Sequence, residues 1–324
     1  MEPVQNIGQA LFRLRGKLMK ASNIGGQAVL EGVMMRNKNQ YAVAVRKPDG
    51  EIAVDVQDAG RSSAVEAMKK IPFLRGVVNF VDSLVVGMST LTYSASFYED
   101  DEATKAKKEK NPEKQERIEK VEMGLTVCLS IVIAIIVFML IPYGVSLLFG
   151  DMIKSVFALA LIEGIIRMII FLVYVWAISL MEDIKRVYMY HGAEHKCINC
   201  IENGLELNVE NVRKSSRFHK RCGTSFLLFV MVVSIIVFAF ISSPSPVVRL
   251  ILRIVLIPVV AGISYELIKL AGRSENPVIS LISKPGLALQ KLTTREPDDS
   301  MIEVGIASVE AVFDWRAFLS EYQR

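Results

Sequence analysis

Four long apolar segments lie in the middle of the chain, at about residues 123–149, 153–181, 225–241 and 247–270. A helix needs roughly 20 apolar residues to cross the hydrocarbon core of a bilayer, and these segments approach or exceed that length. The mean hydropathy of +0.36 and the 52% share of hydrophobic residues agree with a membrane location. We therefore predict an α-helical membrane protein with about four transmembrane helices, the last of them kinked at Pro258.

The N-terminal part has a different period. Residues 40–46 and 51–56 alternate between apolar and polar positions, as half-buried strands do, and Pro48-Asp49-Gly50 between them is a turn sequence. Residues 27–35 suggest a further strand, so we predict a small antiparallel sheet. Gly25-Gly26 before it fits either a turn or a close approach of the backbone to another group.

Two segments separate this sheet from the first span. Residues 71–98 are apolar with a helical period but are interrupted by charged and amide side chains. This pattern predicts a helix that lies on the membrane surface or re-enters it, rather than a fifth span. The dense mixture of Lys and Glu over residues 99–122 predicts a solvated helix or a linker.

The C-terminal part is expected to return to the sheet. Pro285-Gly286 should break the chain, and Ser300 with Glu303 fits a capping box that starts a terminal helix. Together with the sheet, this helix would form a small cytoplasmic α+β part. The predicted parts are a sheet with a membrane-surface helix (1–98), a charged linker (99–122), two spans (123–181), a cytoplasmic His/Cys loop (182–224), two more spans (225–271) and a cytoplasmic tail with the terminal helix (272–324).

Basic residues favour one orientation of the spans. The loop between the second and third segments holds eight Lys and Arg residues, whereas the link between the first two holds Lys154 alone. Because such residues stay on the cytoplasmic side, both termini and the middle loop should be cytoplasmic. The net charge of +4 follows from this bias, so the lipid bilayer is an expected partner and nucleic acid is not.

Candidate chemistry is concentrated in that middle loop. All three histidines and three of the four cysteines lie between His191 and Cys222. His and Cys are ligands that divalent transition metals prefer, and cytoplasmic thiols stay reduced. We therefore predict a metal site, most plausibly for zinc, with a loop of merely packed His and Cys side chains as the alternative.

One pattern in the loop predicts a catalytic site. His191-x-x-Glu194-His195, on a helix that continues out of the second span, would direct both imidazoles to one ion with Glu194 beside them as general base. Such a site needs a third ligand and an open position. The candidates for the third ligand are Glu266, His219, Cys222, Cys200 and Glu202.

A second pattern predicts a structural site. Cys197-x-x-Cys200 and His219-x-x-Cys222 have the spacing of a closed, four-ligand zinc site. The two patterns could serve two ions or compete for one mixed site, and both alternatives remain open at this point.

Three charged residues lie inside the predicted spans. Glu163 and Arg167 are one helical turn apart, and Arg253 is expected at a similar depth. Charges in a span are costly and usually face a partner or a wet cavity. They indicate either a polar chamber or a packing ion pair that fixes the register of the helices.

Several motifs resemble the YqhQ-like family of bacterial membrane proteins. They lie at residues 24–36, 190–196, 219–226 and 292–297, and the resemblance is collinear over about residues 22–315. It implies a multi-pass protein of the bacterial inner membrane and a suspected metal-dependent enzyme, without a reaction. The residues at the family's motif positions are His191, Glu194, His195, Cys200, His219 and Cys222. Lys220 stands where the family pattern has Pro, and Cys197 lies outside it, which favours one mixed site.

Three functions follow as hypotheses. The first is a zinc-dependent hydrolase at the cytoplasmic membrane surface, acting on a membrane peptide or a lipid-linked headgroup, with Glu194 as base. The second is a non-enzymatic scaffold or assembly factor with a structural zinc. The third is a transporter built on the intramembrane charges, which with four spans would require a homo-oligomer.

Overall fold

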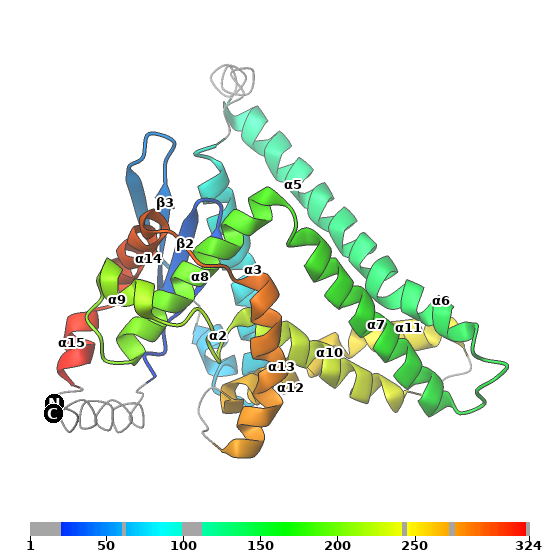
Figure 1. Ribbon diagram of the computed structural model, residues 1–324. Helices are drawn as coiled ribbons and strands as arrows, with labels where there is room; N and C mark the ends of the chain where they lie inside the picture. The colour runs from blue at the N-terminus through cyan, green and yellow to red at the C-terminus, as the bar shows by residue number, and fades with distance from the viewer. Residues whose placement is uncertain (1–20, 60–62, 99–111, 242–244, 272–275, 322–324) are drawn as a thin grey trace, which may run out of the picture.

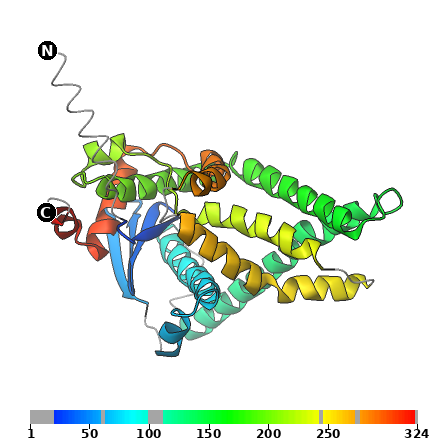
Figure 2. The same ribbon diagram turned by 90° about the horizontal axis from the view of Figure 1, so that it is seen from below.

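The computed structural model describes residues 21–59, 63–98, 112–241, 245–271 and 276–321. The fold is mostly helical with one small four-stranded antiparallel sheet, which confirms the predicted fold class. Figures 1 and 2 show the sheet at one end of the molecule and the apolar helices extending away from it.

The sheet is a meander of four strands in the order β1-β2-β3-β4. Its strands are β1 (Gly25–Val29), β2 (Gly32–Asn37), β3 (Gln40–Arg46) and β4 (Ile52–Asp58). The turn before β4 has Gly50 at a φ of 87°, as the turn sequence predicts. The single strand expected over 27–35 is wrong, because the chain reverses at Glu31, whose φ is 48°, and forms the β1–β2 hairpin.

Both faces of the central strands are covered by helices. One face, with Val33 and Met35, packs on α8 (Glu182–Glu202) and α14 (Asp299–Val312). The other face, with Met34 and Val43, packs on Val86 of α3 (Leu74–Ala95). This alternation follows from the period of two along a strand. It places α8, which carries the His-rich sequence, directly on the sheet.

The terminal helix α14 packs on β2 and β3 as predicted, and the hydroxyl of Ser308 donates a hydrogen bond to the carbonyl of Ala42 at 3.1 Å. Its N-cap differs from the expected one. Asp298, rather than Ser300, accepts the hydrogen bond from the backbone N–H of Met301. A carboxylate two residues earlier competes successfully with the hydroxyl for the free N–H groups of the first turn.

The expected break at Pro285-Gly286 is also wrong, since Pro285 lies inside α13 (Pro277–Thr293). This helix packs against α10 (Gly223–Ala239), and Gly286 allows a close approach to Ser225. Tertiary packing therefore holds a helix that the local sequence would interrupt. The remaining short helices are α2 (Ser63–Met68), α9 (Val209–Lys214) and α15 (Trp315–Ser320).

The described residues contain three helices long and apolar enough to span a membrane, or four if one bent pair is a single span. The first two predicted spans are present as α5–η2–α6 (Pro112–Ile135, Ile136–Leu140, Ile141–Leu147) and α7 (Val156–Ile178). The bent pair is α11 (Pro246–Val255) and α12 (Ile257–Ala271), inclined by 41° next to Pro258. The chain is a multi-pass membrane protein.

One of the expected spans is short, and one helix not expected to span is long enough to do so. The third predicted span is α10, which has only 17 residues. By contrast α3, expected on the membrane surface, meets the length and hydropathy for a span, and 22% of its most apolar window is buried. Part of the linker expected over 99–122 is helical, because α5 begins at Pro112; residues 99–111 lie outside the described chain.

The helix that carries the His-rich sequence is not a continuation of α7. The chain leaves the helical conformation at Met181, whose ψ is 135°, and α8 starts in a new direction (Figure 1). The expectation of one continuous helix is therefore wrong. The side chain of Arg295 donates a hydrogen bond to the Ser179 carbonyl at 3.1 Å, which satisfies one of the carbonyls left free by the break.

The three intramembrane charges form one buried cluster. Arg167 and Arg253 both pair with Glu163, at 2.8 Å and 2.7 Å, and all three residues are at most 5% exposed. Arg167 also donates to the carbonyl of Phe138, which lies in the π-helical turn η2 and accepts this bond at 2.8 Å. The cluster thus joins α11, α7 and the first span, because buried charges need partners in a bilayer.

We expect Glu163→Gln to destabilise the protein by about 3 kcal/mol or more, because it leaves two buried guanidinium groups without a counter-charge. Thermal unfolding in detergent, followed by circular dichroism, should show a clearly lower melting temperature. The matched control is Glu182→Gln, since the Glu182 side chain is 83% exposed and should be neutral. An unchanged melting temperature for Glu163→Gln would contradict the structural role of the cluster.

Candidate metal centre

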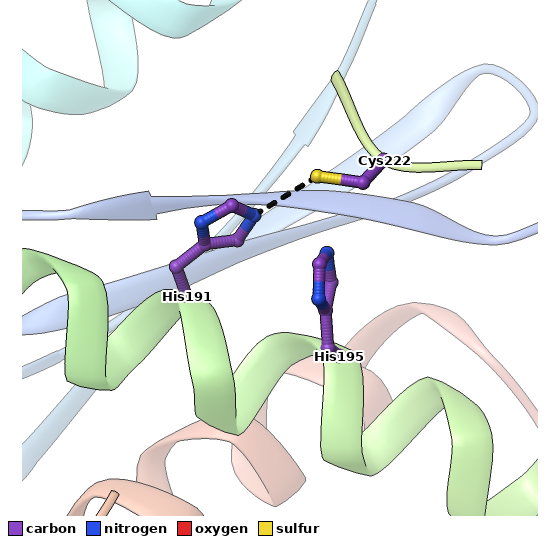
Figure 3. Close-up of side chains that lie close together, drawn as sticks. All are labelled: His191, His195 and Cys222. Carbon is purple, nitrogen blue, oxygen red and sulfur yellow. Dashed lines mark hydrogen bonds between the residues drawn. The ribbon is translucent and has the colours of Figure 1, made fainter. Parts of the chain in front are cut away.

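Three side chains from the His-rich sequence and the following loop converge on one point. The ligand atoms of His191, His195 and Cys222 all lie within 4.8 Å of one another (Figure 3). The two histidines are one turn apart on α8, and Cys222 is the N-cap residue of α10. The Nε2 atom of His191 lies 3.2 Å from the Cys222 sulfur. This group could hold a metal ion.

Both imidazoles are oriented by main-chain carbonyl groups. The Nδ1 atom of His191 lies 2.8 Å from the carbonyl oxygen of Thr293, and Nδ1 of His195 lies 2.6 Å from that of Arg217. A carbonyl oxygen only accepts, so each Nδ1 carries the proton and each Nε2 keeps a lone pair, which in His191 faces the Cys222 sulfur. Metal-binding histidines typically have this arrangement, which fixes both the tautomer and the ring orientation.

The loop that supplies the Arg217 carbonyl is itself held by α8. The ammonium group of Lys196 donates to the carbonyls of Arg213 and Ser215, both at 3.0 Å. The amide of Asn199 donates to the carbonyls on either side of Arg217, those of Ser216 and Phe218, at 2.6 Å and 3.0 Å. These bonds explain why two polar side chains of α8 are buried.

The segment that carries Cys222 is clamped by Gln290 of α13. This fully buried amide accepts from the backbone N–H of His219 at 2.9 Å, donates to its carbonyl at 2.8 Å and donates to the Ser225 hydroxyl at 2.9 Å. Helix α13 therefore positions two members of the cluster, since it also supplies the Thr293 carbonyl for His191.

Glu194 lies beside the cluster rather than in it. Its Oε2 atom is 3.8 Å from Nε2 of His191 and 3.6 Å from Nε2 of His195. Burial raises the pKa of Glu194, against the opposing effects of His191, of His219 and of the backbone N–H of Gly26. A Cβ atom at Gly26 would lie 2.7 Å from Cγ of Glu194, so only glycine leaves room for this carboxylate.

His219 is near the cluster but serves a different network. Its Nε2 atom lies 3.5 Å from Glu202, whose carboxylate also accepts from Ser22 and pairs with Arg221. Burial lowers the pKa of His219 and would raise that of Glu202, but the hydrogen bonds of Glu202 and the charge of Arg221 bring the pKa of Glu202 to about 2. Glu202 is thus committed to an ion pair.

The other candidate ligands lie elsewhere. The Cys200 sulfur faces the carbonyl of Glu206 at 3.4 Å, and burial raises its pKa to about 11. Cys197 is buried against Gly305 of α14. Glu266 forms an ion pair with Arg75 of α3. Cys200, His219 and Glu266 therefore lie outside the group of His191, His195 and Cys222. The four residues whose spacing predicted a closed zinc site do not form a four-ligand arrangement.

Some of the residues that build the centre have no chemical signature of their own. A Cβ atom at Gly192 would collide with the carbonyl oxygen of Arg295, so glycine lets the segment after α13 lie on α8. The N–H of Arg295 then donates to the Tyr188 carbonyl at 2.8 Å. One sequence alone does not predict such contacts, although a glycine between two candidate ligands, Gly192, is a signal for close packing.

Comparison with known proteins identifies the family. A family model described as "Protein of unknown function (DUF1385)" matches residues 71–315. The chain is also 37% identical over 309 residues to "Uncharacterized protein YqhQ" of Bacillus subtilis (strain 168), covering 93% of this chain and 95% of that protein. No solved structure matches the chain. The protein therefore belongs to the DUF1385 family of membrane proteins, as the resemblance implied.

The cluster predicts the metal content of variants. Purified protein loaded with zinc should contain about one ion per chain, and His195→Ala and Cys222→Ser should each lose it, because each removes one of the three protein ligands that an open zinc site uses. Elemental analysis by mass spectrometry measures this content. Cys197→Ser and Cys200→Ser are matched controls that should keep the ion. Loss of the ion in Cys200→Ser, with the fold intact, would contradict this assignment.

Proposed function

We propose that this protein is a zinc-dependent hydrolase that acts at the cytoplasmic surface of the membrane on a membrane peptide or a lipid-linked headgroup. The observation that carries the proposal is the placement of a buried carboxylate, Glu194, within 3.8 Å of the Nε2 atoms of both histidines. Ligands and a carboxylate base in contact are the combination that metal-assisted hydrolysis requires.

The residues present fit a catalytic ion. Two neutral imidazoles and one thiolate form a donor set that suits zinc, and three protein ligands leave a fourth position open. When bound, zinc supplies a Lewis acid that lowers the pKa of a coordinated water toward about 7. The hydrogen bonds to the carbonyls of Thr293 and Arg217 fix the orientation of the two imidazoles independently of an ion.

Glu194 is suited to accept a proton from that water. It shares the helical turn of the two histidines. Desolvation by burial raises its pKa against the opposing effect of His191, so that it is a stronger base than an exposed carboxylate. Gly26 of β1 leaves the space in which its side chain lies. The carboxylate makes no ion pair with Lys or Arg among the described residues, in contrast to Glu202 and Glu266.

The alternative hypothesis is a non-enzymatic scaffold with a structural zinc. It would use the same three ligands, but it would assign no function to the Glu194 carboxylate. The transporter hypothesis receives less support, because Glu163, Arg167 and Arg253 bond to one another and to the wall of the helix bundle. Their contacts are those of a packing ion pair that fixes the helices in register.

We further propose that the sheet, α8 and α14 lie in the cytoplasm with both termini. The excess of Lys and Arg in the loop between α7 and α10 supports this orientation. A green fluorescent protein fused after the last residue should therefore fluoresce, and alkaline phosphatase at the same point should be inactive. The opposite pair of results would reverse the topology and move the centre to the outer surface.

The proposed base predicts a separation of metal binding from activity. Glu194→Gln should keep one zinc per chain but lose about 10²–10⁴-fold in turnover, because it removes the proton acceptor and leaves the ligands in place. The assay is release of product from lipids and membrane peptides incubated with the zinc-loaded protein, detected by mass spectrometry. Full turnover by Glu194→Gln, with its zinc retained, would contradict the role of Glu194 and favour the scaffold.

A further inference from the structure

A large pocket opens beside the candidate metal centre. Its volume is about 820 Å³, within the range of small-molecule sites. Residues of β1, α3, α8, α12 and the start of α10 line it, so it lies where the sheet meets the ends of the apolar helices. His191 is part of its wall, so the pocket adjoins one of the three candidate metal ligands.

The charged side chains that line this pocket are all basic. Five Lys and Arg residues contribute to its wall, and no Asp or Glu does so among the residues that the structure describes. The five are Arg36, Lys38, Lys69, Arg221 and Lys269. They come from four different parts of the chain. Their proximity therefore results from the tertiary fold and not from a basic run in the sequence.

Two carboxylates outside the lining pair with these basic residues. Asp82 pairs with both Arg36, at 2.5 Å, and Lys69, at 3.4 Å, and Glu202 pairs with Arg221. One carboxylate is therefore shared by two of the cations. A pocket whose lining, among the described residues, carries basic side chains and no carboxylate attracts anions between its low-dielectric walls and concentrates them.

Backbone groups and apolar side chains add to the same preference. The first turn of α10, with Gly223 and Thr224 in the wall, contains no acidic residue and directs the positive end of its helix dipole into the pocket. At the other side the wall is apolar, with Val86, Leu227 and Ile268 from the three helices that adjoin the bilayer. The pocket thus offers a cationic surface and an apolar one to the same ligand.

We infer that this pocket binds a phosphate-bearing anion, either the headgroup of a phospholipid or a water-soluble phosphate ester, with its phosphate on the basic wall beside His191. Lys and Arg are the residues that bind phosphate, and a helix N-terminus favours it. The ligand is taken to be the substrate of the hydrolase, and in this respect the inference rests on the proposed function.

The test measures binding with turnover prevented. Full-length, zinc-loaded Glu194→Gln protein in an uncharged detergent is titrated calorimetrically with glycerol 1-phosphate and with dioctanoyl phosphatidic acid. Lys38→Gln combined with Lys69→Gln should weaken binding by about tenfold or more, because two of the cations are removed. Arg36 remains with Asp82 in this variant, and its melting temperature checks that the fold is intact.

The matched control is Lys214→Gln, which removes a charge from α9 outside the pocket, where Lys214 pairs with Glu210. Its affinity should be unchanged. Binding of phosphatidic acid alone identifies the lipid headgroup as the source, and binding of both ligands identifies the phosphate group itself. Absence of binding by either ligand, or equal affinity in the double variant and the control, would overturn the inference.

The results also separate this inference from the proposed function. Charge-dependent binding without hydrolysis of any substrate by the wild-type protein would support the pocket and contradict the hydrolase. Hydrolysis of an uncharged membrane peptide without binding of either phosphate would support the hydrolase and overturn the inference about its substrate.

Discussion

The candidate centre depends on two hydrogen bonds, from Nδ1 of His191 and of His195 to main-chain carbonyl groups. Each bond sets a tautomer and leaves the opposite nitrogen unprotonated, with a lone pair that could bind an ion. The acceptors come from segments about 20 and 100 residues away in sequence, at Arg217 and Thr293. The two imidazoles therefore have this orientation only when the loop before α10 and the end of α13 are both docked on α8. Close packing at Gly192 and the hydrogen bonds of Gln290 hold these segments in place.

Helix α8 belongs to two environments. One face packs on the sheet with α14, and the loop before α10 and the C-terminal end of α13 contact the other, so the site is built where several elements meet. The apolar helices meet this unit at the break after α7 and at the start of α10. An intramembrane cluster of one Glu and two Arg joins these helices, with a π-helical carbonyl as a further acceptor. The sheet with its packed helices and the group of long apolar helices are thus each held by buried polar contacts.

Much of this architecture could be predicted from the sequence, because apolar length and strand alternation are local signals. The long spans, the hairpin with Gly50 and the terminal helix on the sheet follow from such signals. The break before α8 and the helix through Pro285 do not, because tertiary contacts decide them. For the site, residue type and helical spacing predicted His191, His195 and Glu194. Spacing could not select Cys222 over Cys200, since that choice depends on which face of α8 meets the loop.

The central claim is that one ion would be held by two imidazoles and the Cys222 thiolate. X-ray absorption at the zinc edge, on the zinc-loaded protein, tests it most directly because it counts sulfur neighbours. We expect one sulfur at about 2.3 Å with nitrogen or oxygen at about 2.0–2.1 Å, and loss of the sulfur signal in Cys222→Ser. Two or more sulfur ligands, or none, in the folded wild-type protein would contradict it.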